Sequence, residues 1–196
     1  MPFRRTRCPH CRAKLEPGQR IHAECIDAWA TAQADKAERA RAKDERMAAR
    51  VERAETRRRQ EAIKRLPDLH REAQAAFNAY IRARDADKPC ICCGLPLSAG
   101  DVGGRYDCGH YRSIGSAPHL RYDERNAHAQ RKQCNRWGAG RAVDYRLGLI
   151  ERIGLARVEA LEADQSPRKY TADELRSIRD LYRAKLRELV KERANG

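Results

Sequence analysis

Between residues 90 and 135 the chain gathers side chains that can bind metals and move protons. The segment opens with Cys90-Ile91-Cys92-Cys93-Gly94 and continues with Asp107-Cys108-Gly109-His110. It closes with Asn126-Ala127-His128 and Cys134-Asn135. Thiols that suit a structural metal thus bracket an Asp, a His and two Asn that could bind a second metal and activate water.

This set of residues suits hydrolysis of a phosphodiester. An imidazole titrates near pH ~6.5, so His110 can accept a proton from water at neutral pH. Asp107 offers a hard oxygen ligand for Mg²⁺ or Mn²⁺, and the amide oxygen of Asn135 can add a second. Asn126 could orient His110 or the loop that carries it. The alternative is that His110 is a satisfied histidine in a turn and Asp107 an Asx-turn residue.

A second group of metal-binding residues lies near the N-terminus. The ligand types and spacing of Cys8, Cys11, His22 and Cys25 are those of a closed tetrahedral zinc site. His10 stands between two of them, and we expect it to be exposed rather than a ligand. The alternative is a loose tail with incidental cysteines.

Charge and composition indicate a nucleic-acid partner. The 196 residues include 42 Lys and Arg against 28 Asp and Glu, a formal net charge of +14. Such an excess favours a polyanion. No apolar run approaches the roughly 20 residues of a membrane-spanning helix, and no apolar segment follows the N-terminal charges, so we expect no secretory signal and no membrane partner. Eight cysteines without an export signal indicate thiolate ligands rather than disulfides.

The elements that must position these residues are mainly helical. We expect an N-terminal zinc knuckle over 1–27, a long charged helix over 28–66 without Gly or Pro until its end, and a zinc-stabilised domain over 67–196. Pro67 should end the long helix, and Asp68 can cap the next, which helical spacing predicts as an amphipathic helix to about Ala86. Further helices are predicted over 145–163 and, with a capping box, from Thr171 to about Glu192. Residues 88–145 are Gly-rich and weakly periodic, as in hairpins. The fold class is therefore α+β, mainly helical.

Several motifs together resemble the NinG family, that of the phage lambda Rap recombination protein. They are Cys90-Ile91-Cys92-Cys93-Gly94, Tyr106 to Arg112, Leu120 to His128, and Cys134-Asn135. The Cys-rich N-terminus, the charged helix and residues 145–154 are similar too, so the resemblance covers nearly the whole chain. It implies a ββα-metal (His-Asn-His-like) nuclease that cuts branched DNA, such as Holliday junctions or D-loops. It also implies a phage- or prophage-encoded protein in the bacterial cytoplasm.

The resemblance also assigns roles. His110 would be the general base, Asp107 and Asn135 the ligands of a catalytic Mg²⁺ or Mn²⁺, and Cys90, Cys93 and Cys134 ligands of a second structural zinc. The family pattern has a further Cys where this chain has Arg131, which cannot bind a metal. Cys108, Cys92 or His128 could replace it. Otherwise the site would be three-coordinate with water, or lost.

Two functions remain open from the sequence. One is a divalent-metal-dependent endonuclease for branched DNA, and the other is a non-catalytic zinc protein that binds DNA and recruits recombination factors. In both, we expect DNA contacts from basic residues on the long helix and beside the metal sites: Arg57, Arg58, Arg59, Arg112, Arg131, Lys132 and Arg136. The oligomeric state is not determined by the sequence, and a homodimer is one option.

Overall fold

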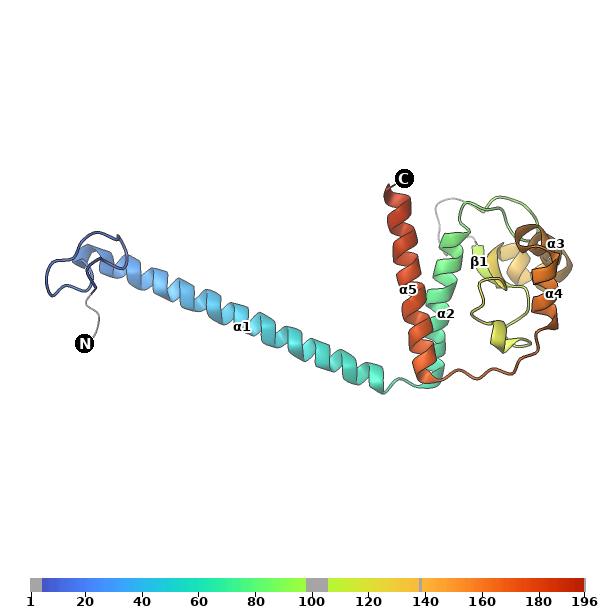
Figure 1. Cartoon of the computed structure of the whole chain (residues 1–196), viewed down its shortest axis with the longest axis horizontal. Helices are drawn as coiled ribbons and strands as arrows, with labels where there is room; N and C mark the ends of the chain where they lie inside the picture. Colours follow the sequence, from blue (N-terminus) through green and yellow to red (C-terminus); the bar gives the residue numbers. More distant parts are fainter. Residues whose placement is uncertain (1–4, 98–105, 138, 196) are drawn as a thin grey trace. The chain divides into compact units, whose positions relative to one another are not determined.

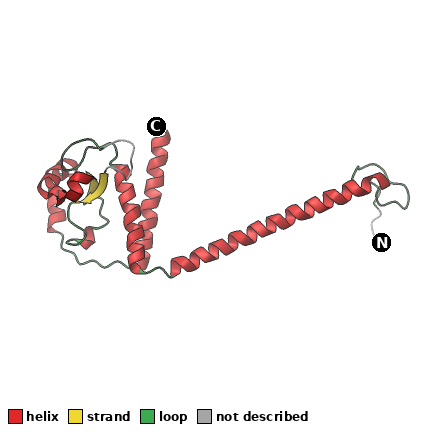
Figure 2. Ribbon diagram, turned by 180° about the vertical axis from the view of Figure 1, so that it is seen from behind, coloured by secondary structure: helices red, strands yellow, loops and turns green. Residues whose placement is uncertain are grey.

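The computed structural model describes residues 5–97, 106–137 and 139–195, and the chain divides into two compact units, Met1–Ile63 and Lys64–Gly196. The described chain is mainly helical, with one two-stranded sheet (Figures 1 and 2). This is the predicted α+β class. No helix in these ranges is long and apolar enough to cross a membrane.

The first unit is a small cysteine-rich loop followed by one long helix. A short 3₁₀ turn, η1 (Ala23–Cys25), leads into α1 (Ile26–Ala62), 37 residues without Gly or Pro. No residue of α1 is buried, so its stability comes from strong helix formers rather than from a core. The helix ends before Pro67, which instead lies in the first turn of the next helix. The missing N–H of proline costs nothing at that position, because a first-turn N–H has no partner within the helix.

In the second unit two long helices run side by side in the same direction (Figure 1). They are α2 (Leu66–Arg84) and α5 (Ala172–Asn195). The rings of Phe77 and Tyr182 meet edge to face with centroids 4.8 Å apart. An ion pair of 2.8 Å joins Arg179 to Glu72 near the start of both helices. The predicted capping box of α5 is present, since Thr171 N donates to the Glu174 carboxylate at 2.8 Å.

Beside α2 lies an antiparallel pair of strands, β1 (Tyr106–His110) and β2 (Ala127–Arg131). A loop containing η2 (Pro118–Leu120) joins them, and the π-helical turn η3 (Gln133–Trp137) follows β2 directly. This order of strand, strand and helical turn places the predicted catalytic residues on neighbouring elements. Cys108 and the loop residue Tyr122 pack with Phe77 in one hydrophobic core.

The chain then forms η4 (Ala139–Arg141), α3 (Ala142–Ile153) and α4 (Leu155–Ala163). The sequence predicts one continuous helix over 145–163, and this is wrong, because Gly154 adopts φ 87°, ψ 151° and separates α3 from α4. A positive φ is available to glycine without the steric cost of a Cβ. Tyr145, Leu149, Val158 and Leu161 form a second buried core.

Candidate metal centres and catalytic site

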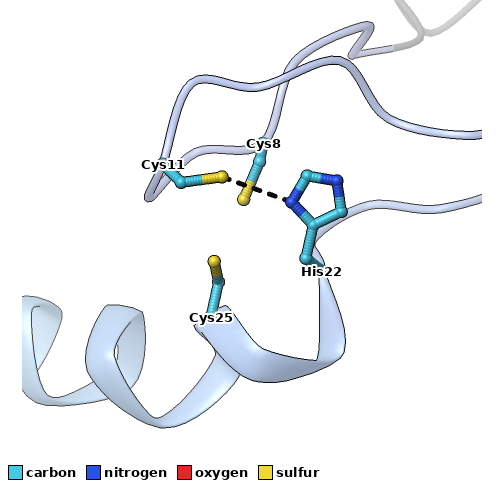
Figure 3. Close-up of side chains that lie close together, drawn as sticks. All are labelled: Cys8, Cys11, His22 and Cys25. Atoms are coloured by element: carbon cyan, nitrogen blue, oxygen red, sulfur yellow. Dashed lines mark hydrogen bonds between the residues drawn. The ribbon is translucent and has the colours of Figure 1, made fainter.

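The N-terminal site has the four predicted donors. The ligand atoms of Cys8, Cys11, His22 and Cys25 all lie within 4.8 Å of one another, and their side chains point toward one another (Figure 3). His22 Nε2 lies 3.2 Å from the carbonyl oxygen of Lys14 and donates to it, which leaves Nδ1 facing the thiols. Three thiols and one imidazole fit a structural zinc. His10 is exposed and outside this cluster, as predicted.

The second site has four thiols, and the fourth donor is Cys92. The sulfur atoms of Cys90, Cys92, Cys93 and Cys134 also lie within 4.8 Å of one another. Four cysteines close a structural zinc site. Cys108 is buried in the core against α2, and His128 packs against Asp85, so neither joins the cluster. Arg131 supports the site through its backbone, because its N–H donates to Cys90 Sγ at 3.3 Å.

Both sites are built on the same type of turn. The residues one before and six after the first cysteine form an isolated antiparallel bridge: Arg7 with Lys14, and Pro89 with Pro96. In each turn the residue after the second cysteine has a positive φ, 66° at Arg12 and 67° at Gly94. The two CxxC segments are thus equivalent knuckles, and Cys92 occupies the position that His10 has in the first.

Backbone N–H groups favour a thiolate at the first cysteine of each site. Burial raises the pKa of this cysteine, but hydrogen bonds from backbone N–H groups outweigh it, first those of His22 and Arg131, which lie outside the two turns, and then those of the turns themselves. These hydrogen bonds lower the pKa of Cys8 to about 6 and that of Cys90 to about 7. A thiolate is the metal-binding form of cysteine. Backbone hydrogen bonds therefore prepare one ligand of each site for zinc.

His110 is the last residue of β1. Its Nε2 lies 3.0 Å from the carbonyl oxygen of Arg121. Since a carbonyl can only accept, Nε2 carries the proton and Nδ1 keeps its lone pair, and Nδ1 has no hydrogen bond within the described residues. Burial, including the ring of Phe77 with its centroid 5.9 Å away, lowers the pKa of His110. The imidazole is therefore neutral at pH 7, as a general base must be.

Asp107 lies on the other face of β1, because residues three apart on a strand point to opposite sides. Its Oδ2 accepts hydrogen bonds from Asn135 Nδ2 at 3.1 Å and from Arg136 Nε at 2.9 Å. Asp107 and Asn135 are thus brought together as predicted. The His110 ring and the Asp107 carboxylate project from opposite faces of β1.

Asn135 links the Asp107 carboxylate to the hollow beside His110. It lies on η3, donates to Asp107, and lines with His110 a hollow of about 420 Å³. Tyr111 and Tyr145 line the same hollow. Within the described residues no donor bonds the amide oxygen of Asn135, so this oxygen is open to a cation. One carboxylate and one amide oxygen suit Mg²⁺ or Mn²⁺, which take the remaining ligands from water and substrate.

Asn126 holds the loop that follows His110. It is fully buried. Its Oδ1 accepts from the backbone N–H of Arg112 at 2.8 Å, and its Nδ2 donates to the carbonyl oxygens of Arg112 and Leu120. Of the two roles considered for Asn126, the structure places it at the loop and not at the imidazole.

The predicted DNA-binding residues occupy different environments. Arg112 donates to the carbonyl oxygens of Leu161 and Asp164 at the end of α4, where it stabilises a helix C-terminus. Arg136 is bound to Asp107 but its side chain remains 58% exposed. Arg131 and Lys132 are half-buried at the end of β2. The three arginines of α1, Arg57, Arg58 and Arg59, are exposed.

A buried ionic network beside β2 was not predicted. Asp85, with no exposed surface, accepts from Arg84 at 2.8 Å and from the backbone N–H of Ala129 at 3.1 Å. His128 and Arg152 approach the same carboxylate at 3.4 Å. Burial raises the pKa of Asp85, but the hydrogen bonds and charges of His128 and Arg84 outweigh it and hold the pKa far below its usual range.

This network joins α2, β2 and α3 to the second knuckle, because Arg152 also donates to the carbonyl of Pro89. In the sequence Asp85 lies within Arg82-Ala83-Arg84-Asp85-Ala86-Asp87-Lys88, which reads as a solvated helix end. Nothing in the neighbouring residues distinguishes the buried carboxylate of Asp85 from an exposed one.

The fold and its sites define the class of protein: a mainly helical α+β chain with two four-donor cysteine-rich clusters, the second of which includes Cys134 from a strand–loop–strand–turn unit. Residues 1–192 match the family model described as Bacteriophage Lambda NinG protein. The chain therefore belongs to the NinG family.

Relatives in this family are phage proteins. The chain is 44% identical to protein NinG of Salmonella phage P22 over a segment of 126 residues. This segment makes up 64% of this chain and 60% of that protein. Over the same length it is 41% identical to protein NinG of Escherichia phage lambda, covering 59% of that protein. The matched segment thus spans about 60% of the length of these curated relatives. No solved structure matches the chain.

Proposed function

We propose that this NinG protein is a divalent-metal-dependent endonuclease that cuts branched DNA during phage recombination. The observation that carries the proposal is the state of His110: a neutral imidazole whose proton is fixed on Nε2 by the Arg121 carbonyl. Nδ1 of His110 has no hydrogen bond within the described residues, and His110 lines the same hollow as Asn135. That arrangement is what a general base beside a cation site requires.

In the proposed reaction a water oxygen attacks the phosphorus while its proton passes to His110 Nδ1. The new P–O bond forms as the bond from phosphorus to the 3′-oxygen breaks. The departing 3′-oxygen takes a proton from solvent, and His110 returns its proton to solvent. The products are a 5′-phosphate and a 3′-hydroxyl. Held in place by Asn126, the loop after His110 keeps the base at the end of β1.

Asp107 and Asn135 would hold Mg²⁺ or Mn²⁺. When bound, such a cation neutralises charge on the phosphate and stabilises the leaving oxygen. The donor set fits, since a carboxylate and an amide oxygen are hard ligands. In the structure Arg136 forms an ion pair with the Asp107 carboxylate. Its half-exposed guanidinium can turn to a DNA phosphate when a cation takes its place.

The second candidate function is a non-catalytic zinc protein that binds DNA and recruits other recombination factors. The Arg136–Asp107 ion pair favours it, because a carboxylate neutralised by arginine is a weaker cation ligand. In that case the role of Asp107 and Asn135 is only to hold the Arg136 side chain in position to bind a phosphate. The zinc knuckles serve the fold under both functions.

Cleavage assays on defined substrates separate the two. Purified protein is incubated with end-labelled linear, flapped and four-way DNA, with and without Mg²⁺ or Mn²⁺. The nuclease proposal expects metal-dependent cutting of the branched forms, which Asp107→Asn reduces and Asp144→Asn, a change at the Arg141 ion pair, leaves intact. Binding to all branched forms without cutting under any metal condition would support the recruitment function instead.

A further inference from the structure

Helix α1 has a line of cations along one face. Seven basic residues recur at alternating spacings of three and four: Lys36, Arg39, Lys43, Arg46, Arg50, Arg53 and Arg57. At about 3.6 residues per turn they fall within a sector of roughly 100° around the helix axis. All seven are exposed. We call this set the cationic stripe.

The middle of the stripe lacks the acidic neighbours that usually accompany a solvated charged helix, which occur only toward its ends, at Asp35 and Glu61. Side chains that face each other on a helix are three or four residues apart. For four consecutive members these neighbours are only Ala, Met, Thr, Lys or Arg: Lys43, Arg46, Arg50 and Arg53. None of the ion pairs found among the described residues involves these four. Like charges at this spacing destabilise a helix, so the stripe does not serve the stability of α1.

The acidic residues of the same stretch lie on the other side. Glu38, Asp44 and Glu45 are the helical neighbours of Arg41, and Glu55 pairs with Arg59 at 3.9 Å. Arg41 and Arg59 therefore belong to a mixed-charge face. Of the three arginines predicted from the sequence to contact DNA on this helix, only Arg57 lies on the stripe.

We propose that the cationic stripe of α1 binds the phosphate backbone of duplex DNA, such as one arm of a branched substrate. From Lys36 to Arg57 the helix rises by 21 steps, which corresponds to about 32 Å at 1.5 Å per residue. Duplex DNA presents one negative charge per about 1.7 Å of axis, so an arm of this length supplies far more charge than the stripe needs. Arg46, Arg50, Arg53 and Arg57 also line one shallow groove with Ala42, Ala49 and Glu45.

This inference rests on the proposed function for the nature of the polyanion, but it does not depend on cleavage. It assigns non-specific affinity to the first unit and leaves chemistry to the second. Because phosphate contacts carry no sequence information, the stripe would hold any duplex arm with equal strength. Branch preference would then come from the second unit.

The test compares two double variants of the full-length, zinc-loaded protein. Arg46→Gln with Arg50→Gln removes two charges from the stripe, and Arg41→Gln with Arg59→Gln removes two from the mixed-charge face. Arg and Gln have similar helix propensities, and circular dichroism verifies equal helicity. Affinity for a 30-base-pair duplex and for a four-way junction is measured by fluorescence anisotropy between 50 and 200 mM salt, without added Mg²⁺.

Each lost phosphate contact should reduce the slope of log K against log salt by about 0.9. The stripe variant should therefore lose about 1.8 in slope, while the control variant keeps a slope close to that of the wild type. Equal slopes for the two variants, with wild-type DNA binding intact, would overturn the stripe and leave the proposed nuclease standing. A wild type that neither binds nor cuts DNA would overturn both. If the wild type cuts DNA and the two variants bind DNA with equal salt slopes, the stripe alone is overturned.

Discussion

The guanidinium of Arg136 lies against the carboxylate of Asp107, with Nε 2.9 Å from Oδ2, at the place where the proposed cation would bind. The two charges compete for one carboxylate. Arg136 comes from η3, one residue after Asn135, so the same helical turn supplies an amide ligand and a competing cation. In the proposed site, a cation can bind Asp107 only as Arg136 is released, so the cation-bound and arginine-bound forms are opposite sides of one equilibrium.

Replacing Arg136 by Gln should therefore lower the Mg²⁺ concentration needed for half-maximal cleavage by a few-fold. The reason is that the carboxylate no longer has to exchange an arginine for the cation. DNA affinity should fall slightly, because one phosphate contact is lost. Metal titration of single-turnover cleavage measures the effect, with Arg125→Gln as the control, since Arg125 forms a similar ion pair with Asp123 at 2.6 Å. An unchanged metal requirement in Arg136→Gln would mean that Asp107 is not a cation ligand.

Zinc content tests the second knuckle. Wild-type protein should contain close to two zinc ions per chain, and Cys92→Ser should contain about one, because Cys92 is the fourth thiol of its cluster. Since a structural zinc can contribute on the order of 10 kcal/mol to folding, thermal stability of the second unit should fall as well. Cys108→Ala is the control, since Cys108 is buried but outside the cluster. Two zinc ions in Cys92→Ser would show that another residue completes the site.

Loss of the Asn126 side chain should destabilise the second unit. Asn126→Ala leaves the N–H and carbonyl of Arg112 and the carbonyl of Leu120 without their partner inside the protein. We expect a loss of about 2–4 kcal/mol in the free energy of unfolding. Asn78→Ala is the matched control, because among the residues that the structure describes the Asn78 side chain bonds only Gln74, on the same helix. Equal unfolding free energies for the two variants, by urea denaturation, would contradict the assigned role.

Much of the first unit was predictable, because its ligands are close in sequence. Cys8, Cys11, His22 and Cys25 fall within 18 residues, and spacing alone indicates a common metal. The choice of Cys92 was not predictable. Its neighbours Cys90 and Cys93 already satisfy the usual pair, and only the three-dimensional position of Cys134 shows that a third thiol of the same turn is needed.

The catalytic side of the fold was predicted only in part. The proximity of Asp107 and Asn135 was expected, and the fixed tautomer of His110 was not, because its partner is a backbone carbonyl in the loop at Arg121. Backbone acceptors leave no trace in residue types. The Asp85 network was missed for a related reason: a buried carboxylate near a helix end reads in sequence like an exposed one.

Cleavage should depend on pH through His110. Burial lowers the pKa of this imidazole below its ordinary value of about 6.5. The base acts when neutral, so the rate should rise with pH through an inflection below about 6.5 and be constant above neutrality. Single-turnover rates between pH 5 and 8.5 at saturating metal provide the measurement. An inflection above pH 7 would assign the titration to another group.

The most direct test of the central claim is single-turnover cleavage of a four-way DNA junction by His110→Ala, with DNA affinity measured on the same preparation. General-base catalysis contributes about 10²–10⁴-fold, so cleavage should fall by that factor while affinity and zinc content stay close to wild type. His70→Ala, which removes another partly buried histidine on α2, should cut normally. A folded His110→Ala protein that cuts the junction at the wild-type rate would contradict the account.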